Sequence, residues 1–192
     1  MDRSTAVFWG LIIMLLTASA FFGFNVMQQR RSLHKAAGAL ENGDLVQLVS
    51  VVDGDTIVVG KEGADNVTVR ILGIKAFESK IEHDIVAPYG RASEDAIRRF
   101  AAGKYFRIML NAPPKDDRGR TLATLFSGDQ DLGLWLVQQG LVLVYTVYPF
   151  PAMPMYLQEQ EKARSAPRGF WENSEVTARA NSLIREWERQ AK

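Results

Sequence analysis

Hydrophobic positions divide the chain into an apolar leading segment, a polar connection and a long stretch of short apolar runs. From Ala6 to Val26 there is no charged residue, and this length is close to the roughly 20 residues that a membrane-spanning helix needs. The pattern predicts a single N-terminal transmembrane anchor over residues 1–27. A cleaved signal peptide stays an alternative, because Ala18-Ser19-Ala20 resembles a processing site. Residues 28–44 are polar and alanine-rich, which predicts a linker or stalk.

Charges beside the apolar segment do not fix the side of a membrane on which the rest of the chain would lie. Arg30, Arg31 and Lys35 follow the segment and Arg3 precedes it, which weakly favours a cytoplasmic domain. A short leading tail is equally compatible with export. The predicted localisation is therefore a single-pass membrane protein of undetermined side.

Residues 45–173 have the pattern of one α+β domain. Short runs rich in valine, isoleucine and leucine are separated by clusters of Gly, Asp, Asn and Pro, which is typical of strands joined by turns. Apolar residues at helical spacing predict three helices between and after these runs. The predicted strands are Leu45–Val52, Thr56–Val59, Val67–Ile74, Tyr105–Leu110, Leu122–Phe126 and Leu141–Val147, and the predicted helices are Gly90–Ala102, Leu132–Gln139 and Met155–Arg164. Together they predict a small closed or nearly closed sheet with helices around it.

Residues 174–192 predict a final amphipathic helix. Val176, Ala180, Leu183 and Trp187 follow one another at spacings of four, three and four residues, so they form a narrow apolar stripe on a charged helix. The stripe either packs on the chain's own domain, stays exposed to solvent or docks on a partner.

Composition excludes several classes of protein. Lysine and arginine number 23 against 22 aspartates and glutamates, so a protein that coats nucleic acid by charge alone is excluded and phosphate binding must be built at one site. The chain has no cysteine, which excludes a disulfide framework and thiol catalysis. His34 and His83 are too isolated for a zinc cluster.

Acidic and basic residues recur at the ends of the predicted strands. Asp53 and Asp55 flank Gly54 between two strands, where a tight turn can aim a carboxylate outward. Glu78 follows the next apolar run, and Arg120 directly precedes another. Carboxylates and arginines that converge on one site suit the chemistry of a phosphodiester.

These residues belong to an ordered set of motifs that resembles the staphylococcal-nuclease-like, or thermonuclease, family. The motifs are Val-Asp-Gly-Asp-Thr at Val52–Thr56, Val-Arg-Ile-Leu-Gly-Ile at Val69–Ile74, Tyr-Gly-x-Ala-Ser at Tyr89–Ser93, Arg-Gly-Arg-Thr-Leu-Ala at Arg118–Ala123, Leu-Val-x-Gln-Gly-Leu at Leu136–Leu141 and Gly-Phe-Trp at Gly169–Trp171. The resemblance implies a five-stranded OB-type barrel with three helices over residues 45–173.

The resemblance also implies site residues. Glu78 is similar in position to the family's water-handling glutamate, and Arg70 and Arg120 match the two arginines that hold the scissile phosphate, which their planar forks suit. Asp55 matches an acidic ligand of a calcium ion. The resemblance further implies that Tyr148 and Arg118 bind the substrate.

The chain departs from the family where the metal is expected. Lys75 stands in the place of the second acidic ligand, and an ammonium about 4 Å from a cation is repelled by roughly 4 kcal/mol at an effective dielectric of 20. Three alternatives follow. Glu82 or Asp84 supplies a ligand, or the Lys75 ammonium takes the place of the ion and touches the phosphate, or Lys75 pairs with Asp55 in an inactive site.

Substrate contacts differ from the family as well. Thr146 and Tyr148 occupy the positions of its paired tyrosines, so only the second tyrosine is kept. Residues 79–85, which include acidic side chains, replace its lysine-rich loop. The lost stacking partner is worth about 1–3 kcal/mol per base.

The sequence therefore predicts a membrane-anchored nuclease, an endonuclease of thermonuclease type, that hydrolyses DNA or RNA through Arg70, Glu78 and Arg120 with a divergent calcium site at Asp55. The alternative is a catalytically degenerate domain that serves as an accessory or scaffold subunit of a membrane complex, bound through its transmembrane helix and the apolar stripe. A third hypothesis, binding of nucleic acid without cleavage, fits an OB-type barrel.

Overall fold

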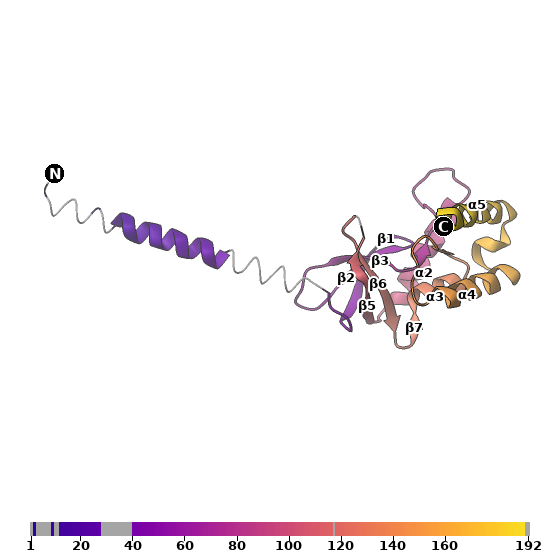
Figure 1. The fold of residues 1–192 in the computed structure, drawn as a ribbon, viewed down its shortest axis with the longest axis horizontal. Coiled ribbons are helices and arrows are strands. Elements are labelled where there is room, and N and C mark those ends of the chain that lie inside the picture. The colour runs from indigo at the N-terminus through magenta and orange to yellow at the C-terminus, as the bar shows by residue number, and fades with distance from the viewer. Residues whose placement is uncertain (1, 3–8, 10–11, 28–39, 117, 191–192) are drawn as a thin grey trace. The chain divides into compact units, whose positions relative to one another are not determined.

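The computed structural model describes residues 2, 9, 12–27, 40–116 and 118–190. The chain divides into two compact units, one of Met1–Ala39 with Gly63–Asp65 and the other of Leu40–Glu62 with Asn66–Lys192. In the first unit residues 12–27 form a helix (Figure 1). Most of the predicted linker lies outside the described residues.

The helix over residues 12–27 corrects the predicted membrane anchor. A spanning helix needs about 20 apolar residues, and the described part of this helix contains the polar side chains of Thr17 and Asn25, which donate to backbone carbonyls of the same helix. None of the helices in the described ranges is long and apolar enough to cross a membrane. The predicted transmembrane helix and single-pass membrane localisation are therefore wrong for the helix that the structure describes.

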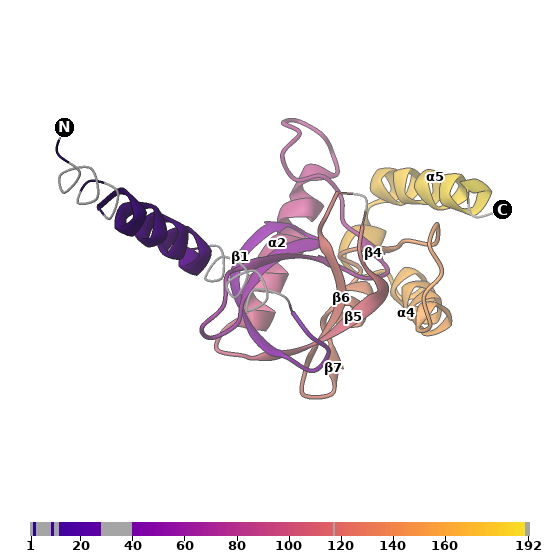
Figure 2. The same ribbon diagram turned by 60° about the vertical axis from the view of Figure 1, so that its left-hand side comes forward.

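Five strands of the second unit close into a barrel. β1 (Leu45–Asp53) pairs with β2 (Thr56–Gly60), which pairs with β3 (Val67–Ile71), and β5 (Phe106–Lys115) joins β1 to β6 (Thr121–Ser127), all antiparallel. A parallel pairing of β3 with β6 completes the ring (Figure 2). The predicted closed sheet of an α+β fold is confirmed.

Three shorter strands extend or flank the barrel. β7 (Gln130–Asp131) continues the sheet beside β6, and β4 (Ile74–Lys75) pairs with β8 (Leu143–Val144) in a sheet of its own. The apolar run that predicted one strand as far as Ile74 is broken because Gly73 adopts a positive φ of 77°. A side chain at Gly73 would also overlap the Phe150 ring.

Five helical segments accompany the barrel in the described part of this unit, and four of them match predicted helices. They are α2 (Ala87–Ala101), α3 (Leu132–Gln138), α4 (Met153–Ser165), the 3-10 helix η1 (Gly169–Glu172) and α5 (Ser174–Gln190). Asp131 caps α3: its carboxylate accepts the N–H groups of Gly133 and Leu134, and it also accepts the Tyr156 hydroxyl of α4 at 2.8 Å. This buried contact ties α4 to α3.

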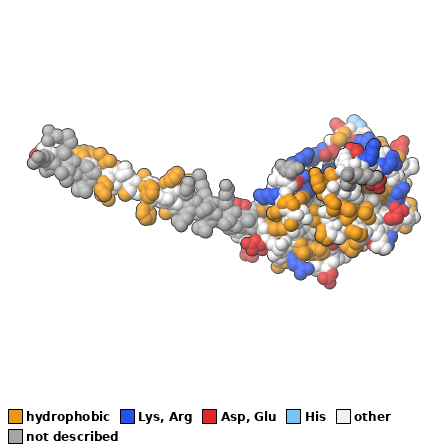
Figure 3. Space-filling view, viewed as in Figure 1, with side chains coloured by type: hydrophobic (Ala, Val, Ile, Leu, Met, Phe, Trp, Pro, Cys, Tyr) orange, Lys and Arg blue, Asp and Glu red, His pale blue; other side chains and the backbone are white. Residues whose placement is uncertain are grey.

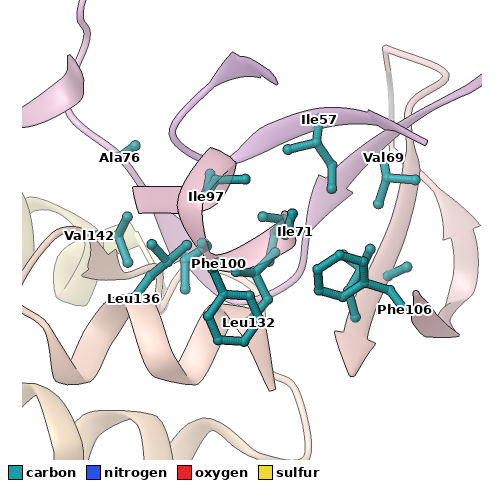
Figure 4. Packing of buried hydrophobic residues seen from close by; sticks show 14 of the residues in the cluster. Ile57, Val69, Ile71, Ala76, Ile97, Phe100, Phe106, Leu132, Leu136 and Val142 are labelled. Carbon is teal, nitrogen blue, oxygen red and sulfur yellow. The ribbon is translucent and has the colours of Figure 1, made fainter. Parts of the chain in front are cut away.

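The barrel interior is filled from the strands and closed by helices. Alternate strand residues such as Ile57, Val69 and Phe106 are almost fully buried, as expected for the inner face of a pleated sheet. Phe100 of α2 packs on Phe106 with ring centroids 6.1 Å apart (Figure 4). Leu132 of α3 lies in the same cluster.

A second apolar cluster holds α5 on the barrel unit. Val176 and Ala180 have no exposed surface, and Trp187 is nearly buried. They pack with residues that include Phe77 and Phe170, whose ring centroids lie 5.0 Å apart. The predicted apolar stripe is therefore used in packing on the chain's own unit.

Candidate active site

Strand register brings three of the predicted site residues, Asp55, Arg70 and Arg120, to one level of the barrel. Thr56 of β2 lies opposite Arg70 of β3, and Arg70 lies opposite Leu122 of β6. Because Arg120 ends the turn just before β6, three neighbouring strands place Asp55, Arg70 and Arg120 close together.

The turn before β2 depends on Gly54. The backbone N–H of Asp55 donates to the Asp53 carboxylate at 2.9 Å, which forms the turn. A Cβ at Gly54 would overlap the Ser93 side chain of α2 and lie 2.7 Å from the Ala76 Cβ. Only glycine lets the turn approach α2 and the β4 segment so closely, so Gly54 sets the position of Asp55.

Asp55 is 1% exposed, and its carboxylate faces donors on every side. Oδ1 accepts the Thr56 hydroxyl at 3.0 Å and is paired with Arg70 Nη1 at 2.9 Å. Oδ2 accepts the Ala76 N–H at 2.9 Å and lies 3.4 Å from Lys75 Nζ. Both oxygens are therefore saturated by groups of the chain itself.

Arg70 uses its donors toward the protein. Its side chain is buried, with Nη1 donating to the carbonyls of Asp55 at 3.0 Å and Ile71 at 3.3 Å, and Nη2 donating to the carbonyl of Ile74 at 2.6 Å. The guanidinium thus joins the ends of β2, β3 and β4, and it supplies positive charge from beneath the site.

Arg120 is the more accessible arginine. Its Nε and Nη2 bind Asp116 Oδ2 at 2.8 and 2.7 Å, and its Nη1 donates to the Thr56 hydroxyl at 3.3 Å. Asp116 also accepts the backbone N–H groups of Arg118 and Arg120, which fixes the turn before β6. Thr56 therefore links Arg120 to Asp55 through one hydroxyl.

Lys75 lies on β4 opposite Leu143 of β8. Its side chain is 49% exposed although its Nζ lies 3.4 Å from the buried Asp55 carboxylate. The ammonium therefore reaches both the interior of the site and solvent. The ion pair between Lys75 and Asp55, which is part of one of the three alternatives left open by the sequence, is present.

Glu78 is exposed on the loop between β4 and α2. Gly90 of α2 packs closely against the backbone on both sides of Glu78. A Cβ added at Gly90 would lie 2.6 Å from the Phe77 carbonyl oxygen and 2.9 Å from the Ser79 N. Arg91 also donates to the Ser79 carbonyl at 3.2 Å. The Glu78 carboxylate accepts the nearby Lys80 N–H at 3.1 Å, and because the side chain is exposed, it stays accessible to a ligand.

The aromatic side of the site contains a residue that the sequence did not indicate. Tyr145 lies beside the exposed Tyr148, with ring centroids 6.0 Å apart, while the Thr146 hydroxyl is buried. Burial and Tyr148 raise the pKa of Tyr145, and the Arg70 charge opposes this shift less strongly. Tyr145 thus lies within electrostatic reach of Arg70, and two tyrosines are paired after all.

The predicted substrate-binding residues are both at the surface. Tyr148 is exposed in the segment after β8, and Arg118 is exposed on the turn before β6. Arg118 adjoins Arg120 through the shared Asp116 contacts of their N–H groups.

The pKa values of the two aspartates of the turn shift in opposite directions. Burial alone would raise the pKa of Asp55, but Arg70, Lys75 and the Ala76 N–H outweigh it and hold that pKa below its usual range. Burial and the neighbouring Asp55 charge raise the pKa of Asp53. Burial lowers the pKa of Arg70, against the attraction of Asp55.

The residues present do not fit a calcium ion of the predicted kind. Calcium takes six to eight oxygen ligands, whereas the Asp55 oxygens already face Arg70, Lys75 and an N–H group. Asp84, one of the possible replacement ligands, accepts the Val86 N–H at the start of α2. The described part of the chain contains no group of three His, Cys, Asp or Glu side chains that could hold a metal.

Comparison with known proteins gives consistent matches. The family described as staphylococcal nuclease homologue matches residues 68–173. A thermonuclease of Staphylococcus intermedius is 29% identical over 131 residues, which cover 68% of this chain and 77% of that protein. A thermonuclease of Staphylococcus hyicus is 27% identical over 165 residues, 85% of this chain and 96% of that protein.

A third relative comes from another genus. An uncharacterized endonuclease of Haemophilus influenzae is 28% identical over 146 residues, which cover 76% of this chain and 74% of that protein. The family match spans β3 to η1, and so includes Arg70, Lys75, Glu78 and Arg120. Since that match covers more than half of the sequence, the chain belongs to the family of staphylococcal nuclease homologues.

Proposed function

We propose that the protein is a nuclease that hydrolyses phosphodiester bonds of DNA or RNA. The observation that carries the proposal is that two arginines from different strands contact neighbouring residues: Arg70 pairs with Asp55, and Arg120 donates to the Thr56 hydroxyl. That hydroxyl in turn donates to Asp55. Two fixed guanidinium groups in one place suit a phosphate whose negative charge increases during the reaction. The thermonuclease and endonuclease relatives support the same activity.

In the proposed reaction, Glu78 accepts a proton from a water molecule as the water oxygen attacks phosphorus. The bond from phosphorus to the leaving oxygen breaks, and that oxygen takes a proton from solvent. Arg120 binds the phosphate oxygens directly, whereas the buried Arg70 stabilises their charge from beneath. Glu78 suits this role because its carboxylate is exposed on a loop that α2 holds in place.

Substrate binding is proposed at the tyrosine pair and at Arg118. The exposed Tyr148 and the half-buried Tyr145 offer aromatic rings to an unpaired base, and each stacked base contributes about 1–3 kcal/mol. Arg118 adds a second positive charge beside Arg120, along the path proposed for the nucleic-acid strand. Unpaired bases are required for such stacking, so single-stranded nucleic acid is the proposed substrate form.

The scaffold alternative loses the surface on which it was based. Val176, Ala180 and Trp187 of α5 are buried against their own unit, so the predicted docking stripe is already occupied.

The residues around Asp55 do not fit a calcium ion, and no step of the proposed reaction uses one.

Cleavage of fluorescent single-stranded DNA and RNA by the full chain tests the proposal. We expect Glu78→Gln to reduce the cleavage rate by about 10²- to 10⁴-fold, the usual contribution of a general base. Glu82→Gln is the matched control, because it removes another exposed carboxylate of the same loop. Equal rates for the wild type and Glu78→Gln would contradict the mechanism, and binding without cleavage by the wild type would favour a nucleic-acid-binding function.

A further inference from the structure

The Asp55 carboxylate has two cationic partners of different character. Arg70 is buried and bound to three backbone carbonyls, so its position is fixed by the fold. Lys75 approaches the other carboxylate oxygen, at 3.4 Å, from a side chain that is half exposed. Lys75 is thus the cation of this pair that faces incoming ligands.

We propose that the Lys75 ammonium is a built-in phosphate-binding cation, so that the protein binds nucleic acid without a divalent metal. This inference rests on the proposed function, since its ligand is the phosphate of the same substrate. It replaces the predicted calcium ion with a group of the chain.

The hydrogen-bonding capacity of lysine supports this role. An ammonium has three donors, and the contact to Asp55 Oδ2 uses one of them. The remaining donors of a half-exposed side chain are accessible to phosphate oxygens. Asp55 carries one negative charge but is paired with both Lys75 and Arg70, so these three side chains together carry one net positive charge.

The fold holds the ammonium at this point. Lys75 lies in the β4–β8 pair opposite Leu143, and the next residue, Ala76, donates its N–H to the same Asp55 oxygen at 2.9 Å. The backbone on both sides of the Lys75 side chain is therefore fixed relative to Asp55. Lys75 forms no covalent bond in the proposed role.

Fluorescence anisotropy of a labelled single-stranded oligonucleotide tests the inference on the full chain. We expect the wild type to bind with the same Kd in a chelator and in calcium. Lys75→Ala and Lys75→Gln should each weaken binding in chelator by about tenfold or more, as loss of a charged hydrogen bond predicts. Lys80→Ala removes an exposed lysine of the following loop and should leave the Kd unchanged.

Two results would overturn the inference. One is wild-type binding that is lost in chelator, and the other is Lys75→Ala binding equal to that of the wild type. Failure of the nuclease proposal gives a different result: no cleavage under any condition, with Lys75-dependent binding in chelator retained, would refute the proposed reaction and support the role of Lys75. Circular dichroism of each variant shows that it is folded.

Discussion

Asp53 and Asp55 are separated by one glycine and have opposite electrostatic surroundings. Burial would raise the pKa of Asp55, but Arg70, Lys75 and the Ala76 N–H lower it, whereas burial and the Asp55 charge raise the pKa of Asp53. The stability that Asp55 contributes is present above its ordinary pKa of 3.8 and is lost as the pH falls through its lowered value. For Asp53, whose pKa is raised, the pH dependence of stability has the opposite sign.

Asp53→Asn should therefore stabilise the protein at neutral pH. The contribution of Asp53 is present below its ordinary pKa of 3.8 and is lost as the pH rises through its raised value. An asparagine oxygen can still accept the Asp55 N–H, and the repulsion between the negative charges of Asp53 and Asp55 is removed. We expect a melting temperature about 2–4 °C higher at pH 7, equivalent to about 1 kcal/mol, and a smaller difference toward pH 4. A variant less stable than the wild type at pH 7 in thermal denaturation would show that the Asp53 charge is favourable.

Motif spacing located several residues of the candidate site but not their contacts. The acids and arginines predicted to converge include Asp55, Arg70 and Arg120, which the register of β2, β3 and β6 brings together. That Arg70 donates inward could not be predicted, because its acceptors include carbonyls set by the turn before β2 and the turn after β3. Tyr145 was missed because it lies one residue from the expected position, at the end of the two-residue strand β8.

At the scale of whole elements, the periodicity of apolar residues predicted where helices form better than it predicted what each helix packs against. The spacing of apolar residues indicated α2, α3, α4 and α5, but the apolar stripe of α5 was equally compatible with a partner protein. In the structure Trp187 packs edge-on against Tyr145 with ring centroids 5.0 Å apart. Helix α5 therefore supports one ring of the tyrosine pair. The parallel closure of β3 on β6 likewise has no local signal, because it joins strands about 50 residues apart in the sequence.

Trp187→Ala should destabilise the barrel unit and weaken oligonucleotide binding together. Removing a buried tryptophan costs about 3–5 kcal/mol, and Trp187 is only 7% exposed. Tyr145 would lose the ring that supports it. Arg185→Ala, on the exposed side of α5, should change the free energy of unfolding by less than about 0.5 kcal/mol.

Urea denaturation and fluorescence anisotropy measure the two effects. A free energy of unfolding for Trp187→Ala within about 1 kcal/mol of the wild type would contradict the packing role of α5. Unchanged oligonucleotide binding by a folded variant would show that Tyr145 does not depend on Trp187.

At the scale of the whole molecule, positive and negative charges are balanced. The net charge is +1, and lysines, arginines and acidic side chains are interspersed on the face of the barrel unit seen in Figure 3. Attraction between the protein as a whole and a polyanion is therefore weak, and most of the binding must come from the few cations of the candidate site.

The salt dependence of oligonucleotide binding tests this view of the molecule. For single strands the slope of log K against log salt is about −0.7 per phosphate neutralised. If Lys75, Arg118 and Arg120 each neutralise one phosphate, a slope of about −2 follows. Anisotropy titrations at several salt concentrations should give this value for the wild type, and Arg118→Ala should make it shallower by about 0.7. Lys61→Ala removes a lysine that is paired with Asp44 and should leave the slope unchanged. A slope steeper than about −4 would require more cations than the site contains, and would place much of the binding on other surfaces of the protein.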